Sequence, residues 1–76
     1  ERLTADEYFD ADATELRLQQ AILSLPKKQQ LVFRLRYYDE MPYDQMSALT
    51  GTSEGALKAS YHHAANKVTD FLNQQD

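Results

Sequence analysis

Two prolines and one glycine divide most of this chain into short segments, and this division limits the folds open to it. Pro26 disfavours a helical conformation at the residue before it and suits the start of a new helix. Pro42 occupies a similar position before the next segment, and Gly51 provides the left-handed conformation with which many helices end. The segments between them are rich in residues that favour helix over strand. The pattern predicts an all-α, four-helix domain without strands.

Apolar spacing and capping residues set the bounds of the four helices, which we expect at about residues 13–24, 27–38, 43–50 and 53–72. Ser53 is a favourable N-cap for the last of them. The apolar residues at helical spacing are Leu18, Ile22 and Leu25 in the first helix, Leu31, Val32, Leu35 and Tyr38 in the second, Tyr43, Met46 and Leu49 in the third, and Leu57, Tyr61, Ala64, Val68 and Leu72 in the fourth.

The last two helices have the spacing of a helix-turn-helix. A short helix, a three-residue turn that contains Gly51 and a longer helix follow one another. Ser47 is small enough for the two helices to approach, and Met46 and Leu57 are expected to fill the space between them. The second helix of such a pair can present its outer face to a DNA major groove. A plain helical hairpin has the same spacing and stays open at this point.

Chain length, the absence of cysteine and the distribution of charge limit the kinds of site and partner that this protein can have. A chain of 76 residues makes one domain with a small core, and without cysteine it has no disulfide and no thiolate zinc site. The formal net charge of −4 argues against a nucleic-acid partner, but the first twenty residues carry all of that excess and the rest is neutral. We expect residues 1–12 to be an acidic linker or frayed lead-in, or else a docking segment that uses Leu3, Tyr8 and Phe9.

Several stretches together resemble region 4 of the bacterial sigma-70 family, in particular the extracytoplasmic-function (ECF) group. They cover about residues 14–72. The stretches are Leu25-Pro26, the run 32–38, the run 41–46, the run 51–58 with its Gly-x-Ser-x-Gly-x-x-Lys pattern, and His62 with Ala64.

The resemblance implies that residues 13–76 form the C-terminal, DNA-reading domain of a cytoplasmic sigma factor, with no enzymatic activity and no cofactor. Its helix-turn-helix would read the −35 promoter element. Its first two helices would face the β flap of core RNA polymerase, and an anti-sigma factor commonly covers the same faces. Region 2, the companion domain, would be joined through residues 1–12.

Eight residues at the start and on the outside of the fourth helix are the candidate DNA contacts. Ser53 can aim helix amides at a phosphate, and Gly55 permits close approach of the DNA backbone. Lys58 is a donor to phosphate or guanine. The remaining candidates are Ala59 and Ser60, which would read base edges or a thymine methyl, and His62, His63 and Lys67, which would meet phosphate.

Adjacent histidines on a helix point about 100° apart, so His62 and His63 are not expected to bind one metal ion together.

Many relatives have arginine where this chain has Ser60, His63, Ala65 and Asn66. Fewer cationic side chains on the fourth helix mean fewer phosphate contacts. We therefore expect the isolated domain to bind DNA weakly and to depend on polymerase for its affinity.

Phe33 and Tyr37 lie four residues apart, off the main apolar stripe of the second helix, and form a candidate exposed interface for polymerase or an anti-sigma factor. We expect Arg34 or Arg36 to pair with an acid of the 39–44 turn. Two alternatives stay open: a protein-interaction domain with the same fold and little DNA binding, and the output domain of a response regulator.

Overall fold

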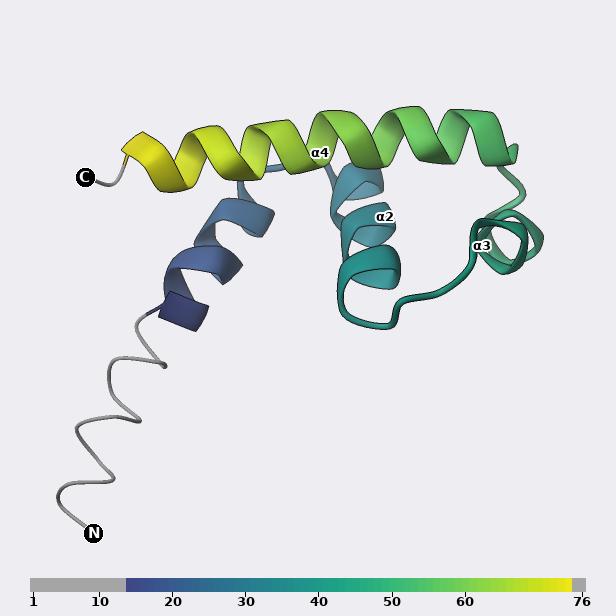
Figure 1. The fold of residues 1–76 in the computed structure, drawn as a ribbon, viewed down its shortest axis with the longest axis horizontal. Helices are drawn as coiled ribbons and strands as arrows, with labels where there is room; N and C mark the ends of the chain where they lie inside the picture. Colours follow the sequence, from purple (N-terminus) through teal and green to yellow (C-terminus); the bar gives the residue numbers. More distant parts are fainter. Residues whose placement is uncertain (1–13, 75–76) are drawn as a thin grey trace, which may run out of the picture.

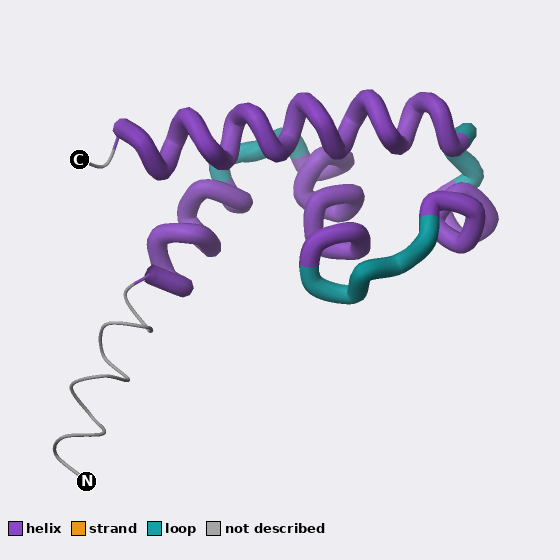
Figure 2. The backbone as a smooth tube through the Cα atoms, viewed as in Figure 1, coloured by secondary structure: helices purple, strands orange, loops and turns teal. Residues whose placement is uncertain are grey.

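The structure, a computed structural model, describes residues 14–74 as four helical segments and no strands (Figures 1 and 2). A first helical segment covers residues 14–23. It is followed by α2 (Lys27–Tyr37), α3 (Tyr43–Thr50) and α4 (Glu54–Gln74). The all-α prediction is therefore confirmed, and the predicted bounds lie within a few residues of the observed ones. The predicted lead-in, residues 1–12, lies outside the described residues.

Local chemistry explains where these helices begin and end. Pro26 and Pro42, with φ of −56° and −62°, stand immediately before α2 and α3. Gly51 ends α3 in the left-handed conformation, with φ of 73°, and its N–H donates to the carbonyl of Ser47. The Ser53 hydroxyl accepts a hydrogen bond of 3.2 Å from the N–H of Ala56, as expected of an N-cap.

α4 is the longest element, and the other three helical segments lie on one side of it (Figure 1). One core cluster forms between the first helical segment, α2 and the C-terminal half of α4, and it contains Ala21, Ile22, Leu25, Phe33, Ala64 and Val68. A second cluster forms between α2, α3 and the start of α4, and it contains Val32, Leu35, Met46 and Leu57. The inward face predicted for α4 is confirmed.

The buried face of α2 differs from the prediction. Phe33, expected to be an exposed interface residue, is only 3% exposed and lies in the first cluster. Leu31 and Tyr38, expected in the apolar stripe, are exposed. The reason is that α2 packs into the first cluster through Phe33 and into the second through Val32 and Leu35, so its buried arc is turned toward Phe33 and away from Leu31 and Tyr38. In α3, Leu49 is likewise exposed, so Met46 is its buried residue.

The connection between α2 and α3 is closed by backbone and arginine hydrogen bonds. The N–H of Met41 donates to the carbonyl of Leu35, and Glu40 between them has a φ of 51°, in the left-handed region. The Arg36 guanidinium donates to the Met41 carbonyl at 3.0 Å. Arg36 therefore binds this turn through a backbone oxygen, and the expected pairing with one of its acids is wrong.

A polar network joins the first helical segment to α2. The Tyr38 hydroxyl donates to the Glu15 carboxylate and accepts from the Gln19 amide, each at 3.0 Å. Arg34 donates to the oxygen of the same Gln19 amide at 3.2 Å. Partial burial of the ring, and then the hydrogen bond to Glu15, raise the pKa of Tyr38 above its usual 10.0. Tyr38 thus holds two helices together from an exposed position.

Candidate nucleic-acid interface

The α3–α4 pair has the arrangement predicted for a helix-turn-helix. In Figure 1, α3 is seen nearly end-on while α4 lies across the view, so the two helices cross at a large angle. Met46 and Leu57 are fully buried between them and belong to the second cluster with Val32 and Leu35. Their burial fixes how α4 projects from the turn.

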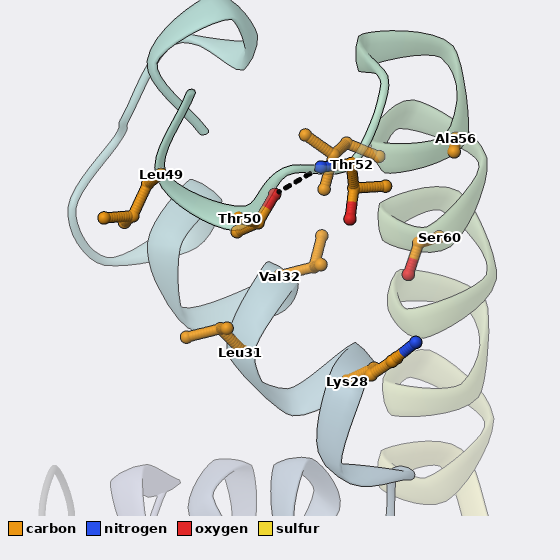
Figure 3. A pocket seen from close by; sticks show the side chains of 9 residues that line it. Lys28, Leu31, Val32, Leu49, Thr50, Thr52, Ala56 and Ser60 are labelled. Carbon is orange, nitrogen blue, oxygen red and sulfur yellow. Dashed lines mark hydrogen bonds between the residues drawn. The ribbon is translucent and has the colours of Figure 1, made fainter. Parts of the chain in front are cut away.

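The turn between α3 and α4 is held by threonine hydroxyls. Thr50 donates from its hydroxyl to the carbonyl of Met46 at 2.8 Å, and the same oxygen accepts from the N–H of Thr52 at 3.2 Å (Figure 3). These two hydrogen bonds therefore close the turn between α3 and α4.

The beginning of α4 is open to solvent. Ser53, Glu54, Gly55 and Ala56 are all exposed. A Cβ added at Gly55 would meet no atom within 4 Å, and its backbone lies outside the left-handed region. The fold therefore does not require glycine at position 55, in contrast to Gly51. A missing side chain at this point leaves the helix start accessible to a partner.

The outer side of α4 carries small and polar residues. Ala59, His62 and His63 are exposed, and His62 Nε2 lies 3.3 Å from the side-chain nitrogen of Asn66, one turn later. The two imidazole centroids are 6.2 Å apart. Over residues 14–74 no group of three metal-binding side chains is brought together. This side of the helix offers hydrogen-bonding groups with little bulk.

The two lysines of α4 lie on opposite flanks of that outer side. At 100° per residue, positions 58 and 67 are about 180° apart around the helix. The Lys58 ammonium is 5.6 Å from the ring centroid of Tyr43 in α3, whereas Ser60 lies on the other flank, in a groove. The eight predicted residues therefore form a wide arc rather than one narrow face, and Lys58 lies at the edge of that arc next to α3.

The groove that contains Ser60 has a volume of about 400 Å³ and is lined by α2, by the end of α3 with the turn that follows it, and by α4. Leu31 and Leu49, which are 50% and 65% exposed, lie at it, and the Lys28 side chain points across it toward Ser60 (Figure 3). Sequence reasoning missed this groove, because it placed both leucines in the core. Their exposure depends on packing that no local pattern reports.

The predicted Phe33–Tyr37 interface is only partly exposed. Phe33 is buried, whereas Tyr37 is 50% exposed and stacks on it with centroids 5.2 Å apart. Tyr61 also stacks with Phe33, with ring centroids 5.6 Å apart. Burial, and then the neighbouring Tyr43, raise the pKa of Tyr61 above 10.0. The three rings line a second, smaller groove of about 200 Å³.

Comparison with known families decides between the helical hairpin and the helix-turn-helix. The model of the family described as "Sigma-70, region 4" matches residues 15–68, most of the chain. The chain belongs to the sigma-70 region 4 family. A sigma region 4 is a DNA-binding transcription domain, and the family is not one of enzymes. No curated protein and no solved structure matches the chain significantly. None of the helices described in this region 4 is long and apolar enough to span a membrane.

Proposed function

We propose that this region 4 reads the −35 promoter element for a sigma factor of the ECF group, acting with RNA polymerase in the cytoplasm. The observation that supports this most is the outer side of α4. It is exposed, it carries small and polar residues, and it begins at a helix start left open by Gly55. A side of this kind can enter a major groove, which admits an α-helix and displays the base edges that differ between base pairs.

The positions of the charges fit this docking. A helix with its side chains is about 10–12 Å across, close to the width of about 12 Å of the major groove. Because Lys58 and Lys67 lie on opposite flanks, each would face a different strand of the DNA backbone. Ala59 and His62 lie between these flanks and would face base edges, which for His62 replaces the phosphate contact expected from the sequence. Ser53 and Gly55 would meet phosphate at the helix start.

A selection of DNA sequences tests this proposal. The chain would be incubated at low salt with duplexes that contain a random segment, and the bound duplexes would be sequenced. We expect a recurring motif, and we expect His62→Ala and Ala59→Val to alter its preference at individual positions. Asn73→Ala is the matched control, because Asn73 lies on the same side of α4 near its C-terminal end.

Enrichment without any sequence motif would contradict promoter reading by this face. The alternative of a protein-interaction domain would then account for the fold. A change of motif by Asn73→Ala equal to that by His62→Ala would also contradict the assignment, since the contact would not be confined to the start of α4.

We further propose that Tyr37, the accessible member of the predicted aromatic pair, contacts the polymerase β flap or an anti-sigma factor. The half-exposed ring beside the smaller groove supports this. Tyr37→Ser is expected to weaken binding to core polymerase while leaving DNA selection by the chain unchanged. Thr69→Ser, which alters the same groove by one methyl group, serves as the control. Unchanged polymerase and anti-sigma binding by Tyr37→Ser would exclude this surface.

A further inference from the structure

Two cationic side chains from different helices converge on one aromatic ring. The guanidinium carbon of Arg36, in α2, is 4.9 Å from the ring centroid of Tyr43. The ammonium of Lys58, in α4, is 5.6 Å from the same centroid. Both distances lie within the range of attraction between a cation and the negative face of an aromatic ring. Tyr43 therefore links the two helices through their charges.

The ring of Tyr43 has a fixed place in the fold. Tyr43 is the first residue of α3, directly after Pro42, and it packs partly buried against the second core cluster. Arg36, which lies against the ring, is itself held by the Met41 carbonyl at 3.0 Å. The surface that Lys58 meets is thus set by α2, the turn and α3 together.

We propose that Tyr43 is a positioning residue for DNA binding, which holds the Lys58 ammonium at the α3 edge of α4 where it meets a backbone phosphate. This inference rests on the proposed function and assigns the ring a part in it. A free lysine side chain samples many rotamers and must be ordered when it binds. An ammonium already held beside the helix would lose less freedom on contact with phosphate.

The aromatic ring of Tyr43 suits this role better than a charged side chain would. A carboxylate beside Lys58 would neutralise its charge and would repel the phosphate. An aromatic ring attracts the ammonium through its quadrupole and carries no net charge, so the full positive charge of the lysine stays available. In a helix with only two lysines, this difference affects a large share of the attraction to DNA.

The test combines a ring variant, a lysine variant and their double mutant in the full chain. Tyr43→Leu is expected to weaken binding to the selected duplex about two- to fivefold, the effect of losing an exposed cation–π contact. Tyr43→Phe keeps the ring and is expected to bind as the unchanged chain does. Lys58→Ala should reduce the slope of log affinity against log salt by about one. In the Lys58→Ala background, Tyr43→Leu should have no further effect.

A second measurement does not depend on DNA. In the free chain, the protons next to the Lys58 ammonium should show an upfield ring-current shift by NMR, which Tyr43→Leu removes and Tyr43→Phe retains. An equal loss of affinity from Tyr43→Leu with and without Lys58 would overturn the positioning role and leave promoter reading intact. Binding unchanged or tightened by Tyr43→Leu would overturn it as well. If the chain selects no DNA, the proposed function fails and the positioning role fails with it, even where the NMR shift is present.

Discussion

The two glycines of the chain flank the start of α4, and the backbone conformation requires glycine at only one of the two positions. Gly51 has a φ of 73°, a conformation that side-chain-bearing residues adopt only at a cost of about 1–2 kcal/mol. Gly55 has ordinary helical geometry and open space around it. Glycine at 55 therefore weakens the free helix without any structural need, which points to a partner as its reason.

The variant Gly55→Ala tests whether glycine at position 55 serves the fold or a DNA partner. In the free chain it should raise the free energy of unfolding by about 0.4–1 kcal/mol, because alanine restricts the unfolded chain and favours helix. In complex with DNA it should weaken binding, because the added methyl group meets the backbone. Urea unfolding and fluorescence anisotropy measure the two effects.

Gly51→Ala is the contrasting variant and should lower the unfolding free energy by about 1–2 kcal/mol. If Gly55→Ala stabilised the chain and left DNA binding unchanged, Gly55 would have no role as a point of close approach.

The residues that end helices could be predicted from the sequence, whereas the buried arc of α2 could not. Pro26, Pro42, Gly51 and Ser53 act through their own backbone or through atoms three to four residues away, so their effect is local. The burial of Phe33 instead depends on α4 and on the first helical segment, which arrive from distant parts of the chain.

The candidate site divides in the same way. The cap at Ser53 and the exposure of Gly55 follow from the pattern at the start of α4. The contact of Lys58 with Tyr43 joins residues fifteen positions apart on two helices and could not be read from spacing alone.

At the scale of elements, the first helical segment is attached to α2 both by the first core cluster and by the hydroxyl of Tyr38. The pKa of Tyr38 is raised in the fold, as is that of Tyr61. A raised pKa means that the folded state holds the proton more tightly than the unfolded chain does. The resulting stabilisation is complete below the ordinary value of 10.0 and is lost as the pH rises above it.

Thermal unfolding at several pH values should accordingly show a loss of stability above about pH 10. Tyr38→Phe should lower the unfolding free energy at neutral pH by about 0.5–1.5 kcal/mol, the usual contribution of a hydrogen bond, with the exposed site near the lower end. The alkaline loss should become shallower in this variant and should persist in part, because Tyr61 remains. An alkaline loss identical to that of the unchanged chain would show that Tyr38 does not contribute to it.

At the scale of the whole molecule, the net charge of −4 is unevenly placed. Residues 14–74 hold seven bases and six acids, so the described body is not itself anionic. Five acids and one base precede residue 14, and like charges of this kind slow the approach of DNA over distances near the Debye length.

Replacing Asp10 and Asp12 by asparagine should therefore raise the association rate with DNA at low salt. The increase should shrink as salt rises from about 0.01 M to 0.15 M, because the Debye length falls from about 30 Å to about 8 Å. Stopped-flow fluorescence measures the rate, and Gln74→Asn, which leaves the charge unchanged, is the control. An increase of the same size at both salt concentrations would contradict the electrostatic explanation.

Tyr61 packs against both core clusters and lies on α4, one of the two helices that contribute to both. A chain with two small cores has two possible melting units, and the side chain that touches both makes them melt as one. Tyr61→Ala should therefore broaden the thermal transition and make the van't Hoff enthalpy of unfolding smaller than the calorimetric enthalpy. In the intact domain, destabilising the first helical segment would then also destabilise the distant α3–α4 turn, which sets the direction of α4.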